Sequence, residues 1–291
     1  MANLKEVRTR IASVSSTQQI TSAMKMVSAA KFRRAQNAII GMRPYAASLQ
    51  EIISDIGEGQ GTLTPFHAVR PVHSVVIVVV TSNKGLCGAF NSNVIKLAQQ
   101  RIEHWHGEGA AIKLACMGKK ASEFFSRQKN LSLTSYDEFL DAPSFDTIAG
   151  LADSLMADFA AKGIDRVEVV YNKFKNSLTQ IITCEQWLPV ERVERKAESS
   201  ERKANNDYIY EPSQEEILRE MIPLTLRSTF YRMVLDSLAA EHGARMNAMQ
   251  KATDNATELI KDLRLSYNKA RQANITNEII EIVSGSEALK G

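Results

Sequence analysis

The sequence predicts an α/β fold joined to a long antiparallel coiled coil, in which the N- and C-terminal helices pair. Two long stretches at opposite ends of the 291 residues are nearly free of glycine and proline. Both carry apolar residues at spacings of three and four, the repeat of a coiled-coil seam. Between them, β-branched runs alternate with helical segments, as in a parallel sheet with helical connections. The expected divisions are an N-terminal coiled-coil helix (1–57), a central α/β domain (73–190), a charged linker (191–212) and a C-terminal coiled-coil helix (213–285).

The N-terminal helix shows the seam in two parts. The first is Leu4, Val7, Ile11 and Val14, and the second is Ile39, Met42, Ala46, Leu49, Ile53 and Ile56. Small and polar residues connect the two parts, so a neighbouring helix would pack there closely but weakly. We expect Pro44 to kink the helix. The glycine-rich stretch 57–61 ends it.

The C-terminal helix is predicted to begin near Ser213, where a capping residue precedes acidic residues. Its seam residues are Met249, Ala252, Ala256, Leu259 and Leu263. After Pro223 there is no further proline, and Gly243 is the only glycine before Gly285. A helix of roughly sixty residues at about 1.5 Å per residue would be on the order of 90 Å long. Such a helix needs a partner for its apolar face, and the N-terminal helix supplies one.

The central segment begins with His73–Val80, a β-branched run without alternation that is typical of a parallel strand buried on both faces. Further strands are expected at 111–117 and 166–174, and an antiparallel edge strand at 178–187. Helices are expected at 91–105, 119–127 and 144–161. This βαβ order predicts a Rossmann-like domain.

The composition excludes several classes of protein. With 44% hydrophobic and 24% charged residues the chain can bury a core, and a net charge of +3 does not require nucleic acid as a partner. The segment up to Arg43 carries eight basic residues against the single acid Glu6, which indicates an acidic neighbour. The three cysteines form no CxxC pair, which favours a reducing compartment. No apolar run is long enough for a transmembrane segment, and Met1–Arg10 lacks the apolar core of a signal peptide.

One segment invites a search for chemistry. Thr81–Asn91 lies between a buried strand and a helix, where α/β proteins bind ligands. Its glycines match neither GxGxxG nor GxxxxGK[ST], so we favour a structural turn over a nucleotide site. Cys87 has no base nearby in sequence, and His104 and His106 would point about 200° apart on a helix. We therefore predict no catalytic, cofactor-binding or metal-binding residues.

The residues alone describe a long antiparallel rod that carries a small α/β body. Such a chain could transmit position or force between partners. A nucleic-acid reader is disfavoured, because the basic residues are scattered around the first helix and the last helix is electrically balanced. A coiled-coil adaptor and a βαβ enzyme with helical extensions remain as alternatives.

Four stretches resemble one known family. They are Ile11–Lys31, the turn Lys84–Asn91, Asp207–Pro212, and the tail segments Ala252–Ala256 and Tyr267–Gly285. Together they resemble the gamma subunits of F-type ATP synthases of the bacterial type, over essentially the full length. The alternative is a coiled-coil adaptor with an α/β head that is no part of an ATPase.

The resemblance implies a non-catalytic central rotor stalk. The paired helices would stand inside a hexamer of alternating alpha and beta subunits, and the α/β body would lie near the epsilon subunit and the membrane c-ring. Rotation of the c-ring, driven by protons, would then change the conformation of the catalytic beta subunits. No cofactor and no nucleic acid are implied. The place of such a subunit is the cytoplasmic face of the bacterial inner membrane, as a peripheral protein without a transmembrane segment.

The resemblance also implies contact residues. Those facing the hexamer would be Met24, Lys84, Arg271, Gln272 and Thr276. Those facing the c-ring would be Tyr208, Tyr210 and Glu211. On a helix Gln272 and Thr276 are four residues apart and share one face, next to Arg271.

Overall fold

The computed structural model describes residues 4–57, 65–128, 131–141, 143–176, 179–190 and 213–288. The chain divides into two compact units, Met1–Ala29 with Arg245–Gly291, and Ala30–Ala244. The helices are α1 (Leu4–Gly57), α2 (Phe90–Gly107), α3 (Lys119–Phe125), α4 (Phe145–Ala160) and α5 (Gln214–Ala288), with short 3-10 turns η1 (Pro65–His67) and η2 (Asp137–Leu140). The strands are β1 (Ser74–Val80), β2 (Ala111–Met117), β3 (Ser132–Ser135), β4 (Arg166–Phe174) and β5 (Gln180–Leu188).

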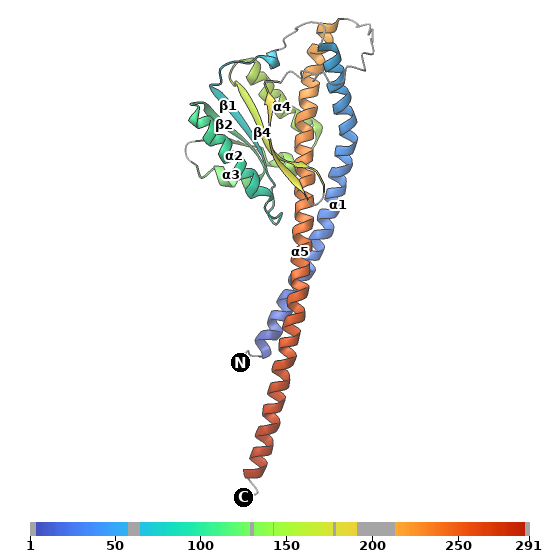
Figure 1. Cartoon of the computed structure of the whole chain (residues 1–291), viewed down its shortest axis with the longest axis vertical. Helices are drawn as coiled ribbons and strands as arrows, with labels where there is room; N and C mark the ends of the chain where they lie inside the picture. Colours follow the sequence, from blue (N-terminus) through green and yellow to red (C-terminus); the bar gives the residue numbers. More distant parts are fainter. Residues whose placement is uncertain are drawn as a thin grey trace, which may run out of the picture. The chain divides into compact units, whose positions relative to one another are not determined.

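The larger unit is built on a five-stranded sheet of order β3-β2-β1-β4-β5 (Figure 1). The first four strands in this order are parallel, and β5 joins β4 antiparallel at the edge. The central strand β1 is buried along almost its whole length, as expected for a strand covered on both faces. The predicted strands 111–117 and 166–174 match β2 and β4, and the predicted edge strand matches β5.

Helices cover both faces of this sheet. On one face, Ile77 and Val79 of β1 pack with α2 and α3 in a core that includes Trp105 and Phe125. On the other face, Val78 packs with α4 and with the first part of α5. Side chains alternate along a strand, so one β-branched strand serves both cores. The architecture is a three-layer α/β sandwich (Figure 1).

The first part of α5 belongs to this body. Nine of its apolar side chains are buried in the second core, and Phe230, Val234 and Ala239 are fully buried. Ile39 of α1 is only 2% exposed and lies in the same core. The helix is therefore a core element here as well as half of a coiled coil.

The smaller unit is an antiparallel helix pair. Thr21 of α1 bonds Thr253 of α5 through their hydroxyls at 2.9 Å, and the Gln18 amide donates to the Thr257 hydroxyl at 2.6 Å. Residue numbers fall along one helix as they rise along the other, so the pair is antiparallel. These contacts and the sheet confirm the predicted fold class.

The predicted seam is wrong at one position. Leu259 is 45% exposed, whereas Ile260 is only 7% exposed. The seam steps by four from the buried Ala256 to Ile260 and then by three to the half-buried Leu263. Both neighbours are apolar, so the spacing rule could not decide between them. The side of α5 that buries Met249 and Ala256 also carries Ile260, so Ile260 is the seam residue.

Two other expectations concern breaks and missed elements. Helix α1 continues through Pro44 without ending there, and the kink expected at that residue stays a prediction. The sequence did not indicate β3, because the strand Ser132–Ser135 is short, mostly polar and mostly exposed. Register with β2 rather than hydrophobicity makes this segment a strand.

Candidate functional site

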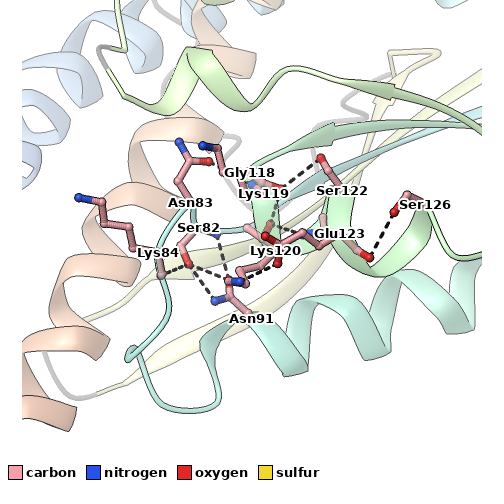
Figure 2. A network of polar contacts seen from close by, with 12 residues as sticks. Ser82, Asn83, Lys84, Asn91, Gly118, Lys119, Lys120, Ser122, Glu123 and Ser126 are labelled. Atoms are coloured by element: carbon pink, nitrogen blue, oxygen red, sulfur yellow. Dashed lines mark hydrogen bonds and ion pairs between the residues drawn. The ribbon is translucent and has the colours of Figure 1, made fainter.

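The turn after β1 lies at the carboxyl ends of the parallel strands, and Figure 2 shows its side chains next to Asn91 of α2 and the start of α3. Asn83 donates to the Asp137 carbonyl and to the Asp141 carboxylate, both at 2.9 Å. The Asn91 amide donates to the Ser82 hydroxyl at 2.8 Å. The edge where many α/β proteins hold a ligand is thus crossed by bonds within the chain.

The first N–H groups of α3 are already occupied. The Lys119 N–H donates to Asn83 Oδ1 at 3.0 Å, the Ala121 N–H to Thr81 Oγ1 at 3.0 Å, and the Gly118 N–H to Asp137 Oδ1 at 3.2 Å. Free N–H groups at a helix start are what binds phosphate in nucleotide sites. Side chains of this chain therefore take the positions that a phosphate would occupy, and the absence of a nucleotide site stays a prediction.

Gly118 explains how β1 and β2 end so close together. Its φ is +114°, and a Cβ built there would lie 2.4 Å from the Thr81 carbonyl oxygen. Thr81 in turn donates its backbone N–H to the Met117 carbonyl at 2.8 Å. Only glycine fits this crossing of two loops.

The cysteines are packing residues. Cys87 is 2% exposed, accepts a bond from the Asn91 amide at 3.2 Å, and packs against Phe90 and Ala240. Burial raises the pKa of the Cys116 thiol to about 12, and burial together with Glu168 does the same for Cys184. A thiol with so high a pKa is not a nucleophile at neutral pH.

The most buried carboxylate is also structural. Glu168 is 2% exposed and receives Arg101 in a forked pair at 2.7 and 2.8 Å, with Arg166 at 3.0 Å. Burial is the largest single effect on the pKa of Glu168 and raises it, but the hydrogen bonds and charges of Arg101, Trp105 and Arg166 together hold the pKa below its ordinary value. A carboxylate held ionised in this way is poorly suited to act as a general acid or base. Among the described residues no group of three or more His, Cys, Asp or Glu could hold a metal ion.

The turn presents a few groups outward. Lys84 is exposed, and in Figure 2 its side chain extends away from the bonded cluster. Leu86 is 61% exposed with a φ of +62°, a conformation that leucine rarely adopts. The predicted contact residue Lys84 therefore lies on the surface of the α/β body.

The predicted tail residues lie on a fully exposed stretch of α5. Arg271, Gln272 and Thr276 are all exposed, and the Thr276 hydroxyl donates to the Gln272 carbonyl at 2.9 Å. Every described side chain from 271 to 287 is exposed. Apolar ones are among them, with exposed fractions of 47% to 71%: Ile275, Ile279, Ile280, Ile282 and Val283.

Met24 lies on α1 and is half-buried. Its neighbours Met26 and Val27 are 65% and 59% exposed, and Ile20 is 57% exposed. On this helix the resemblance indicated only Met24, whereas Ile20, Met26 and Val27 have larger exposed fractions. Apolar residues outside the seam spacing are the signal that could have indicated them.

Tyr208, Tyr210 and Glu211 lie outside the described residues, as does the predicted linker 191–212. The described helices include none that is long and apolar enough to cross a membrane.

Comparison with known proteins identifies the class. The model of the ATP synthase family, described as "ATP synthase", matches residues 3–289. An ATP synthase gamma chain from Flavobacterium psychrophilum is 49% identical over the whole of both chains. The one from Cytophaga hutchinsonii is 47% identical over 99% of each chain, and the one from Geobacter sp. is 43% identical over the whole of both.

Solved structures agree on the fold. A chain from the central stalk and c-ring of the Tetrahymena thermophila mitochondrial ATP synthase is 26% identical, with a TM-score of 0.58 over 80% of this chain and 99% of that one. A chain of the Euglena gracilis mitochondrial ATP synthase has a TM-score of 0.71 at 20% identity, over 98% of this chain and 94% of that one.

A unit of two paired long helices and a unit with a five-stranded α/β sheet define the class, a coiled-coil protein with an α/β domain. The chain belongs to the family of ATP synthase gamma chains, the non-catalytic subunits of the central rotor stalk. The alternative of an adaptor unrelated to an ATPase is therefore set aside.

Proposed function

We propose that this chain couples proton-driven rotation of a membrane c-ring to conformational changes in catalytic beta subunits. The helix pair would stand inside a hexamer of alpha and beta subunits, and the α/β body would contact the c-ring and an epsilon subunit. The place of work would be the cytoplasmic face of a bacterial inner membrane.

One observation carries this proposal, the exposed apolar tail of α5. At about 100° per residue its isoleucines and Val283 spread over nearly half of the helix circumference. A helix that exposes apolar side chains over so wide an arc needs a partner on several sides. A ring of subunits around the helix meets that need better than a single flat partner.

The polar residues on the same stretch suggest how the contact changes during rotation. Arg271, Gln272 and Thr276 can donate hydrogen bonds to acidic or polar loops of the hexamer in some positions and release them in others. Different contacts with different conformations of the ring are what couples shaft position to binding affinity. Met24 and Lys84 would add contacts from α1 and from the body.

The contacts with the c-ring are proposed from the resemblance alone. Tyr208, Tyr210 and Glu211 would contact the c-ring. Replacing Tyr208 by Ala should weaken retention of the c-ring when the complex is purified in detergent.

The test is assembly and pumping with tail variants. The double change Ile275→Asp and Ile279→Asp should leave the helix content of the chain unchanged, because both side chains are exposed. It should reduce co-purification with alpha and beta subunits or abolish ATP-driven proton pumping in vesicles. The matched control is Glu278→Gln with Glu281→Gln on the same stretch, which should do little. Normal assembly and pumping by the aspartate variant would contradict the proposal.

A further inference from the structure

A polar cluster links the edge of the sheet to α5 inside the larger unit. We call it the β5–α5 clamp, and its members are Tyr171 and Lys173 of β4, Glu185 of β5, and Arg232 and Asp236 of α5. All five residues lie within Ala30–Ala244, so the clamp belongs to one compact body.

Glu185 is the centre of the clamp. The Tyr171 hydroxyl donates to Glu185 Oε1 at 2.8 Å, and Lys173 Nζ lies 3.3 Å from the same oxygen. The other oxygen, Oε2, faces Arg232 Nη2 at 3.4 Å. Arg232 also reaches Asp236 Oδ2 through Nη1 at 3.3 Å, one helical turn further on.

Strand register explains why these groups meet. Glu185 is opposite Val169, which belongs to the core beneath α5. Directly opposed residues of an antiparallel pair point to the same face, and so do residues two apart on one strand. Tyr171 and Lys173 therefore share the α5 face with Glu185. The sheet positions the Glu185 carboxylate, and α5 positions the Arg232 guanidinium.

Four of the five clamp side chains are at most 26% exposed, whereas Lys173 is 47% exposed. Tyr171 is fully buried, the Asp236 side chain is 3% exposed, and the Arg232 and Glu185 side chains are 22% and 26% exposed. Removing one partner of a charge pair in such a setting is strongly destabilising, because the other partner stays buried without its counter-charge.

The apolar contacts around the clamp do not by themselves fix how α5 is rotated on the sheet. Apolar burial holds α5 against the sheet, yet it is non-directional, and the helix presents Ala239 and Ala240 on its buried side. A directional contact nearby is the Trp187 indole, which donates to the Leu226 carbonyl at 3.2 Å. The ion pair of the Arg232 guanidinium with Glu185 of β5 adds a second directional contact, and together the two oppose rotation of α5 about its own axis on the sheet.

We propose that the β5–α5 clamp is a positioning device that transmits torque between the α/β body and α5. This inference rests on the proposed function, because torque has to pass from the body into the helix pair. Without the clamp, α5 would still pack on the sheet but would rotate relative to it when torque is applied. Hydrolysis in the hexamer would then continue while less of its rotation reached the c-ring.

The experiment uses the complete complex reconstituted in vesicles, with ATP hydrolysis and ATP-driven proton uptake measured on the same preparation. Arg232→Gln is the test variant, and Arg232→Lys keeps the charge without the planar fork. The matched control is Arg166→Gln, because Arg166 is similarly exposed and pairs with a buried glutamate of the sheet but its ion pair does not involve α5. Thermal unfolding of each purified variant shows any general loss of stability.

The expected result is a loss of proton uptake per ATP hydrolysed in Arg232→Gln, a partial return in Arg232→Lys, and an unchanged ratio in Arg166→Gln. Adding Glu185→Gln to Arg232→Gln should cause little further loss, because the two residues act as one pair. An unchanged ratio in Arg232→Gln would overturn the inference, and so would an equal loss in Arg166→Gln. A wild-type complex that assembles but pumps no protons would overturn the proposed function itself, and the role of the clamp with it.

Discussion

At the scale of single residues, the polar side chains around the turn after β1 hold loops in place. Thr81, Asn83 and Asp137 bond the first N–H groups of α3, so a site that could have bound phosphate serves the fold. The sequence predicted the position of the turn between a buried strand and a helix. It could not predict these partners, because Asp137 is more than fifty residues away from Asn83.

Gly118→Ala tests the close crossing of the two loops. A methyl group at φ +114° would meet the Thr81 carbonyl, so the variant should lose about 1–3 kcal/mol of unfolding free energy. Urea unfolding followed by circular dichroism measures the loss. The control is Gly150→Ala in α4, where a Cβ meets nothing within 4 Å, and this change should be neutral or slightly stabilising. Equal stability of the two variants would contradict the account.

Glu168 predicts a particular dependence of stability on pH. Because the folded state lowers the pKa of Glu168 below its ordinary value of 4.5, the ionised form stabilises the fold. That contribution is complete above pH 4.5 and is lost as the pH falls through the lowered pKa. Glu168→Gln should therefore be less stable than wild type at neutral pH, and the difference should shrink in acid. A difference that stays constant between pH 7 and pH 3 would show that the carboxylate is not ionised in its pair.

At the scale of elements, the heptad spacing predicted both long helices and their pairing but not the whole seam. The difference between Leu259 and Ile260 is a single step of three or four, which local sequence leaves undecided. Similarly, β2 and β4 were predictable from their β-branched runs, whereas β3 depends on a neighbour in space. The β5–α5 clamp was not predictable either, since its members are spread from residue 171 to residue 236.

Neighbouring substitutions test the corrected seam. Ile260→Ala removes a side chain that is 7% exposed, and it should cost about 2–4 kcal/mol, less where water reaches the seam. Leu259→Ala removes one that is 45% exposed and should cost clearly less. Thermal unfolding of the two variants compares them directly. A larger loss for Leu259→Ala would restore the seam that spacing alone predicted.

At the scale of the whole molecule, polar side chains at the described edge of the sheet bond within the chain, whereas apolar residues are exposed at the end of α5. Composition and spacing predicted a rod with a body and no assembled active site. They could not show which faces need a partner, because exposure depends on the packing of helices distant in sequence.

Arg271→Ala tests the polar contacts of the tail. If Arg271 makes a charge-assisted bond to the hexamer, its loss should weaken assembly by about 1.5–3 kcal/mol while the isolated chain stays folded. Binding of the purified chain to an alpha–beta complex measures the change. Lys261→Ala, an exposed charge earlier on the same helix, is the control and should bind like wild type. Equal binding by both variants would show that Arg271 makes no charge-assisted bond to the hexamer.

The central claim, that this chain turns as a shaft, is tested most directly by watching it rotate. A cysteine placed at Glu103, an exposed position on α2, would carry a bead, since Cys87 and Cys116 are buried, and Cys184→Ser would remove the third thiol. With the alpha and beta subunits fixed to a surface and ATP supplied, the account predicts sustained rotation of the bead in one direction. A bead that stays fixed, or moves only at random, on complexes that hydrolyse ATP would contradict it.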